Sequence, residues 1–222
     1  MHTYTVYKPG NSTMEWHTPL QHARAAGILY LVTHVTSIVA VVAYSAGLIP
    51  AGVTLEFALA LGCAGTGVLL WHLLREFGPA RAATFAVLRA VEASVIIAGT
   101  LPMLAIMWSD VAGGQSSAIS AMHTASFLVG QGLVISVNTI VLGWLLWDAR
   151  VVPRALAGLG VVGGMLVLAS NTCQLWGVIP LNGAVAGAAA VPVFAFEIWL
   201  AITLIVRGLR APAGASRRSV AG

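Results

Sequence analysis

Two charged residues, Arg89 and Glu92, lie one helical turn apart inside an apolar stretch that runs from about residue 82 to residue 108. An ionised side chain near the centre of a bilayer costs roughly 2.5 to 3.5 kcal/mol on insertion scales, so such residues face the interior of a helix bundle, pair with each other and mark functional sites. This pair therefore predicts a polar site within a membrane.

Other polar residues are predicted to share the depth of this pair. With about 1.5 Å of rise per residue, Glu197 and Gln131 fall near the level of Glu92, and His34 lies slightly short of it. Residues three, four or seven apart share a helical face, which gives polar stripes on three predicted spans: Gly27, Tyr30, His34 and Ser37; Ser120, Thr124, Gln131 and Asn138; Gly164, Asn171 and Gln174. The predicted site, for ligand binding or proton handling, consists of Tyr30, His34, Arg89, Glu92, Gln131, Asn138 and Glu197.

Three functions agree with this pattern. The first is binding or transport of a small molecule or lipid, in which Glu92 and Glu197 change protonation while Arg89 holds an anionic group or tunes Glu92. The second is a structural or accessory subunit, in which the polar groups only clamp helices together. The third is an intramembrane enzyme on a hydrophobic substrate, with a carboxyl group or His34 as general acid or base. It ranks last because the sequence shows no nucleophile and base pair, metal-ligand spacing or cofactor motif.

The elements that position these residues follow from composition. Of 222 residues, 59% are hydrophobic and 8% charged, and the mean hydropathy is +0.91. A bilayer core about 30 Å thick needs about 20 mostly apolar residues per helix. Six stretches qualify, which predicts an all-α polytopic membrane bundle with spans at residues 25–46, 53–74, 82–107, 121–147, 155–178 and 184–206.

The basic residues predict the orientation of these spans. Lys and Arg flank the first span, the second and third, the fourth and fifth, and the end of the sixth, at Lys8, Arg24, Arg75, Arg81, Arg150, Arg154, Arg207, Arg210, Arg217 and Arg218. The alternate loops contain none, so both termini are predicted in the cytoplasm of an inner (plasma) membrane protein. The predicted organisation is a polar segment at 1–24, a transmembrane domain at 25–207 and a basic disordered tail at 208–222.

The sequence argues against nucleic-acid binding, cysteine chemistry and haem binding. The net charge of +4 follows from topology rather than from a nucleic-acid-binding face. Cys63 and Cys173 are predicted to be buried and inert, and His72 and His123 lie near opposite faces, which excludes a shared haem. We expect no cofactor and no metal. The expected partners are membrane lipids, a small hydrophobic or amphipathic ligand and a second copy of the chain.

Residues near the span ends are assigned ordinary roles. Glu56 and Asp110 are predicted to be solvated charges at the outer boundary. Aromatic residues near span ends are typical of interfacial belts, and they are Tyr44, Trp71, Trp108, Trp144, Trp147 and Trp176.

Four segments also carry a family resemblance. They are ARAAGILYLV at residues 23–32, the pair Arg89 and Glu92, GWLLWDARVVPRALAGLGVVGG at 143–164, and Pro192 with EIWLAITLIVRG at 197–208. Together they resemble the bacterial membrane family catalogued as domain of unknown function 4386, over about residues 22 to 210. The resemblance implies a multi-spanning membrane protein and carries no activity. The glycines from 158 to 164 are predicted to allow close helix packing.

Overall fold

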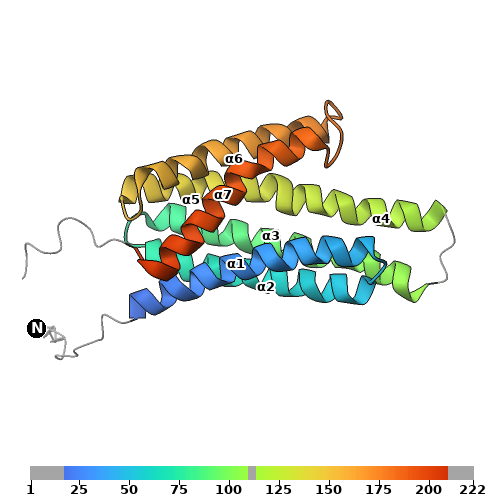
Figure 1. Ribbon diagram of the computed structural model, residues 1–222, viewed down its shortest axis with the longest axis horizontal. Helices are drawn as coiled ribbons and strands as arrows, with labels where there is room; N and C mark the ends of the chain where they lie inside the picture. The colour runs from blue at the N-terminus through green and yellow to red at the C-terminus, as the bar shows by residue number, and fades with distance from the viewer. Residues whose placement is uncertain (1–17, 110–113, 210–222) are drawn as a thin grey trace, which may run out of the picture.

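The computed structural model describes residues 18–109 and 114–209, and these form only helices and turns. The elements in chain order (Figure 1) are α1 (Thr18–Ser45), α2 (Ile49–Leu74), α3 (Pro79–Trp108), α4 (Gly114–Phe127), the π-helix η1 (Leu128–Val134), α5 (Ile135–Ala149), α6 (Arg154–Leu175) and α7 (Ala184–Val206). The predicted all-α class is confirmed.

Six stretches of the described residues are long and apolar enough to cross a membrane, with α4, η1 and α5 joined into one of 34 residues. Their outward side chains are apolar, as Val35, Leu61 and Val87 illustrate with exposed fractions of 61%, 57% and 62%. Water would disfavour such a surface, whereas lipid chains match it. The chain is therefore a multi-pass membrane protein. The first helix starts at Thr18, earlier than the predicted residue 25.

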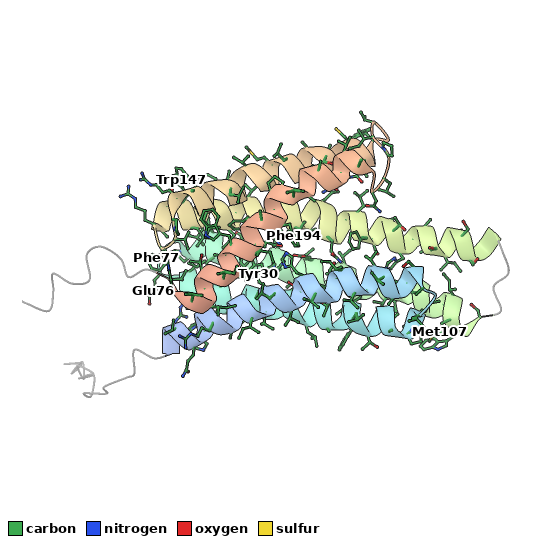
Figure 2. All side chains as sticks on the ribbon, viewed as in Figure 1. Tyr30, Glu76, Phe77, Met107, Trp147 and Phe194 are labelled. Atoms are coloured by element: carbon green, nitrogen blue, oxygen red, sulfur yellow. The ribbon has the colours of Figure 1, made fainter. Side chains whose placement is uncertain are left out.

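α1 begins and α7 ends at the same end of the bundle, where the α2–α3 and α5–α6 connections also lie (Figure 1). Glu76 and Phe77 lie at this end and Met107 at the other (Figure 2). We call it the arginine-rich end, after the arginines in and beside these connections and termini: Arg24, Arg75, Arg81, Arg150, Arg154 and Arg207.

Local sequence explains the α5–α6 connection. Arg150 adopts a left-handed conformation (φ 57°) and ends α5. Pro153 precedes the first residue of α6 with φ −56° and ψ 136°, an extended geometry that a proline ring allows and that helices use at their start. The valines between them turn inward, with Val151 only 1% exposed.

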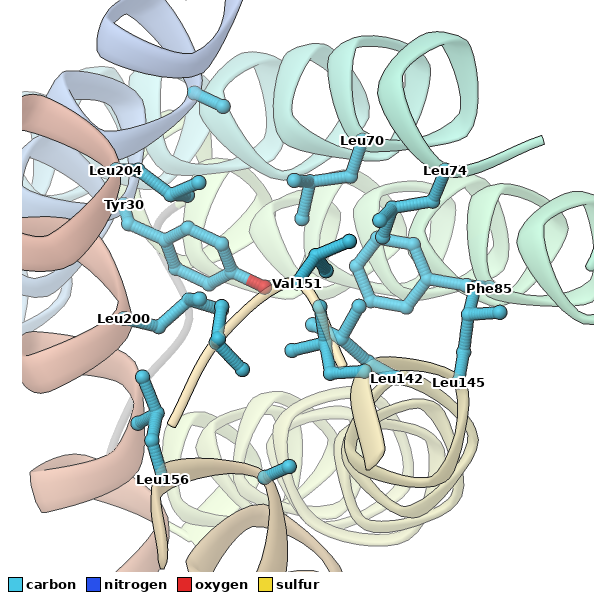
Figure 3. Packing of buried hydrophobic residues seen from close by; sticks show 14 of the residues in the cluster. Tyr30, Leu70, Leu74, Phe85, Leu142, Leu145, Val151, Leu156, Leu200 and Leu204 are labelled. Carbon is cyan, nitrogen blue, oxygen red and sulfur yellow. The ribbon is translucent and has the colours of Figure 1, made fainter. Parts of the chain in front are cut away.

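A single apolar core fills the arginine-rich half of the bundle (Figure 3). The largest members of this apolar core come from all six spans and include Tyr30, Leu70, Leu74, Phe85, Leu142, Leu145, Leu156, Leu200 and Leu204. Val151 of the connection also packs into it. This end of the bundle is therefore closed by packed side chains.

Glycines set the distances between helices, as predicted for the α6 run. A Cβ on Gly164 would lie 2.9 Å from the Ser136 carbonyl oxygen, and one on Gly163 would lie 3.0 Å from the Val193 nitrogen. Gly27 plays the same part between α1 and α7, since its Cβ would come within 2.6 Å of the Ala201 oxygen. α1 and α7 thus meet near the arginine-rich end, and from there α1 continues along α2 while α7 continues along α6 (Figure 1).

The π-helix η1 was not predicted. It interrupts the fourth span in the sequence LVGQGLV, where Gly130 faces Val95 of α3 and Gly132 faces Asn171 of α6. π-helical turns are rare and occur frequently at functional sites. This one carries Gln131 between its two glycines.

Candidate functional site

A cavity of about 250 Å³ lies in the middle of the bundle. We call it the central cavity. Its lining comes from all six spans: Thr33, His34, Ser37, Leu59, Cys63, Arg89, Glu92, Gln131, Ile135, Val167, Ala190, Val193, Phe194 and Glu197. On each helix these residues lie farther from the arginine-rich end than the members of the apolar core do, except on α7, where Glu197 lies next to the core residue Phe196. The apolar core therefore closes the cavity on that side.

The mouth of the central cavity lies between α1 and α7. Ala190 and Phe194 line the cavity and are exposed on α7, Phe194 by 47%, and His34 and Ser37 are half-buried on α1. Phe194 lies midway along the bundle (Figure 2). Because these helices diverge from their crossing at Gly27, the exposed lining residues lie away from the arginine-rich end.

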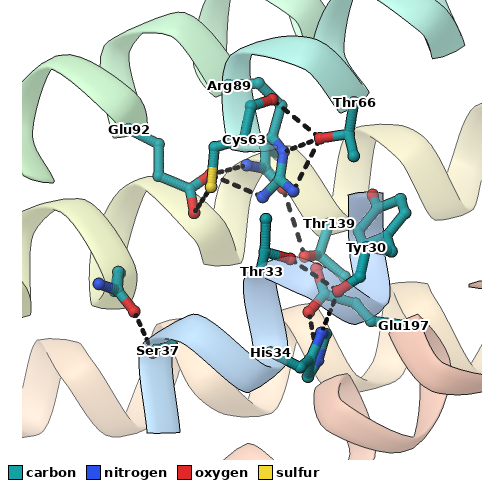
Figure 4. Close-up of polar contacts among 12 residues, drawn as sticks. Tyr30, Thr33, His34, Ser37, Cys63, Thr66, Arg89, Glu92, Thr139 and Glu197 are labelled. Atoms are coloured by element: carbon teal, nitrogen blue, oxygen red, sulfur yellow. Dashed lines mark hydrogen bonds and ion pairs between the residues drawn. The ribbon is translucent and has the colours of Figure 1, made fainter. Parts of the chain in front are cut away.

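Arg89 is bound from three sides (Figure 4). Its Nη1 donates to Glu92 Oε2 at 2.9 Å, and its Nε and Nη2 both donate to Thr66 Oγ1, at 3.1 and 3.0 Å. Its guanidinium carbon lies 5.2 Å from the centre of the Tyr30 ring, within the range of a cation–π contact. Gly67 leaves room for this side chain, because a Cβ there would lie 2.9 Å from Arg89 Cβ.

The carboxylate oxygens of Glu92 also have hydrogen-bond donors within the protein. Besides Arg89 it accepts a hydrogen bond from Asn138 Nδ2 at 2.8 Å, and the Cys63 thiol lies 3.7 Å from its other oxygen. Arg89 and Glu92 are each only 2% exposed. A buried ion pair is stable only when its remaining donors and acceptors are satisfied as well, and this pair meets that condition.

The second charged pair joins α1 to α7. His34 Nε2 lies 3.2 Å from Glu197 Oε2, and His34 Nδ1 lies 2.8 Å from the backbone oxygen of Tyr30. The Phe194 ring packs edge-on against the imidazole, with 5.0 Å between ring centres. The two side chains are 12% and 8% exposed, so they form part of the cavity wall.

The structure brings all seven predicted site residues to one region. Five of them line the central cavity: His34, Arg89, Glu92, Gln131 and Glu197. Tyr30 and Asn138 lie behind this wall and hold Arg89 and Glu92. Gln131 accepts a hydrogen bond from Ser37 at 3.1 Å, which links η1 to α1.

Several residues of the site were not predicted, among them Cys63, Thr66 and Phe194. Thr66 and Cys63 belong to α2, which offered no charged residue at this depth. Only their spacing of three residues, which places both on the face toward α3, gave a signal. Phe194 had none, because an aromatic residue in an apolar span usually faces lipid or core.

Two predicted polar stripes are only partly right. Ser120 is exposed, and Thr124 bonds back to the Ser120 oxygen at 3.2 Å instead of facing the cavity. The reason is that η1 intervenes and changes the angular register of the fourth span. On α6, Gln174 donates to Asn171 at 2.9 Å and accepts from the Asn182 backbone at 2.8 Å, so this pair holds the α6–α7 connection.

Glu56 corrects a further prediction, since it is 4% exposed rather than solvated. Tyr44 OH donates to its Oε2 at 2.7 Å, and His123 Nε2 lies 2.9 Å from its Oε1. Tyr44 therefore serves a buried carboxyl group and is not part of an interfacial belt. The five predicted tryptophans are exposed near helix ends. Asp110 lies outside the described residues.

Comparison with known proteins gives one match. None of the curated proteins and none of the solved structures compared with the chain match it. The model of one family, described as domain of unknown function (DUF4386), matches residues 25–208, which contain most of the first span, the other five spans and the whole central cavity. The chain belongs to the DUF4386 family.

Proposed function

We propose that this membrane protein binds a small amphipathic molecule in the central cavity. The observation that carries the proposal is the His34–Glu197 pair on the wall of a cavity whose mouth opens beside exposed residues of α7. Ligand pockets commonly measure about 300 to 1,000 Å³. The central cavity, at about 250 Å³, is smaller than these pockets. It therefore suits a small ligand, or the polar end of a longer molecule.

The alternative is that the charged residues only clamp helices. The Arg89–Glu92 pair fits that role, since its hydrogen bonds are made inside the protein. The His34–Glu197 pair does not, because a clamp needs no adjoining cavity and gains nothing from partial exposure. The lining is mixed, with polar Gln131 and Ser37 as well as apolar Val167 and Phe194, and this supports an amphipathic ligand.

The direction of access follows from the same geometry. The apolar core closes the arginine-rich end, so a ligand enters between α1 and α7 from the bilayer. Transport would in addition require this core to part. We propose a location in the plasma membrane with the arginine-rich end in the cytoplasm, supported by the arginines gathered there.

Native mass spectrometry of gently solubilised protein tests the binding. We expect the wild type to retain a small molecule or lipid, and Ala190→Trp to lose it, because the indole would fill the mouth of the cavity. Ala188→Trp is the matched control, since Ala188 is an exposed residue of the same helix that does not line the cavity. Equal retention in the two variants would contradict the proposal. A wild type without any retained molecule would favour an accessory subunit.

A further inference from the structure

The contacts of His34 determine where its protons lie. Its Nδ1 faces the Tyr30 carbonyl oxygen at 2.8 Å, and a carbonyl oxygen only accepts hydrogen bonds, so Nδ1 carries a hydrogen. Its Nε2 faces Glu197 Oε2 at 3.2 Å. Without a further proton, a nitrogen lone pair would face a carboxylate oxygen there. The pair therefore shares one more proton, on Nε2 or on the carboxyl group, and is electrically neutral as a whole.

The other titratable groups facing this pair leave the balance unchanged. Tyr30 of α1 and Cys63 of α2 are neutral groups, and Arg89 and Glu92 of α3 cancel each other. The cavity-lining residues of η1, α5 and α6 do not titrate; they are Gln131, Ile135 and Val167. The central cavity thus has no net charge with the shared proton and one negative charge without it.

We propose that the ligand of the central cavity is an organic ammonium ion, and that its binding releases the shared proton of the His34–Glu197 pair to the solvent. This inference builds on the proposed function and names its ligand class. The ammonium N–H groups donate to the Glu197 carboxylate and to the freed lone pair of His34 Nε2. One positive charge enters and one leaves, so the cavity stays neutral. An uncompensated charge at this depth costs several kcal/mol, which favours exchange over simple addition of a cation.

An anionic ligand fits this wall less well. Three of the five N–H donors of Arg89 bind Glu92 and Thr66, and the Tyr30 ring lies against its face. An anion beside Arg89 would compete with the Glu92 carboxylate for a single cation, and the cavity would then hold one uncompensated negative charge. The apolar part of the ligand has Val193 and Phe194 to contact. An ammonium group on a short aromatic or aliphatic body matches these surfaces.

Isothermal titration calorimetry of the full chain in lipid nanodiscs tests the exchange with three probes of similar size: 2-phenylethylammonium, 2-phenylethanol and 3-phenylpropanoate. We expect the ammonium probe to bind about tenfold or more tightly than the other two. Titration in two buffers of different ionisation enthalpy counts the protons released, and we expect about one per ligand. Release of one proton also weakens binding about tenfold for each unit by which the pH falls below neutral.

Glu197→Gln should abolish both the proton release and the preference for the ammonium probe. Glu56→Gln is the matched control, because it alters a second carboxyl–histidine pair that does not line the cavity, and it should keep both. A proton count near zero in the wild type overturns the inference, as does ammonium binding no tighter than that of the alcohol. The proposed function is decided separately, by whether Ala190→Trp and Ala188→Trp differ in the molecule they retain.

Discussion

Arg89 has a structural role that differs from the role of Glu197, because contacts inside the protein hold its guanidinium group. Its charge is neutralised by Glu92, two further N–H donors bind Thr66, and Tyr30 covers one face. Such a pair gives the cavity a fixed polar wall without contributing net charge. Glu197 instead has His34 as its ion-pair partner among the described residues. In the proposed exchange, the pair that releases a proton is therefore not the pair that forms this fixed wall.

Removing Arg89 alone should destabilise the protein strongly. Arg89→Met leaves the Glu92 carboxylate buried without its cation, which costs about 3 to 5 kcal/mol in such pairs. The double variant Arg89→Met with Glu92→Leu should recover most of this loss, because no uncompensated charge remains. Thermal unfolding in detergent, followed by circular dichroism, measures both.

Arg81→Met is the control, since Arg81 pairs with Asp148 at the surface, where side chains are 32% and 46% exposed. Loss of an exposed pair costs about 0 to 1 kcal/mol. A double variant as unstable as the single one would show that Arg89 stabilises the fold through packing and not through charge.

The sequence predicted the charged residues of the site and two of their neutral partners, Tyr30 and Asn138, but not Thr66 and Cys63. Arg89, Glu92 and Glu197 are conspicuous because charge is rare in a membrane span. Thr66 and Cys63 are common residues in spans, and their contacts depend on which face of α2 meets α3. Glu56 was assigned to solvent because its position near a span end suggested exposure, whereas its burial depends on Tyr44 and His123 from two other helices.

At the level of elements, the length of the apolar stretches predicted the helices, and local backbone geometry determined what length and composition do not show. The sixth span was predicted at 184–206, as observed. The fourth was predicted as a regular helix, because a π-turn changes no residue type and leaves the hydrophobic pattern apolar throughout. Gly130 and Gly132 were the only trace of η1, and they approach α3 and α6 on either side of Gln131.

The contact between α5 and α6 should depend on Gly143. A Cβ there would lie 2.8 Å from the Val161 nitrogen and 3.0 Å from the Ala157 oxygen, and backbone atoms cannot rotate aside. We expect Gly143→Ala to lower stability by about 1 to 3 kcal/mol, as overpacking does in close-packed interiors. Thermal unfolding of the purified variant measures the loss.

Gly187→Ala is the matched substitution within α7, because nothing lies within 4 Å of its added Cβ. It should leave stability unchanged or raise it by up to about 1 kcal/mol, since alanine favours a helix. Equal losses in the two variants would mean that helix propensity, and not the approach of α5 to α6, determines the effect.

At the scale of the whole molecule, the arrangement of the helices closes the cavity toward the arginine-rich end and leaves it open between α1 and α7. α1 and α7 cross at Gly27, and the apolar core around the crossing joins all six spans. Farther from the arginine-rich end, α1 packs along α2 and α7 packs along α6, and the cavity opens between α1 and α7. The side of the membrane that faces the arginine-rich end therefore determines the leaflet from which the proposed ligand enters.

Reporter fusions expressed in a bacterial host should place the arginine-rich end in the cytoplasm. Green fluorescent protein fused after Leu209 should fluoresce, and alkaline phosphatase fused there should be inactive, because arginines gather on the side that is not translocated. Fusions after Ser109, which follow three spans, should give the opposite pattern. The two positions control for each other, since expression level affects both alike. The reverse pattern would put the closed end outside, and the proposed ligand would then enter from the cytoplasmic leaflet.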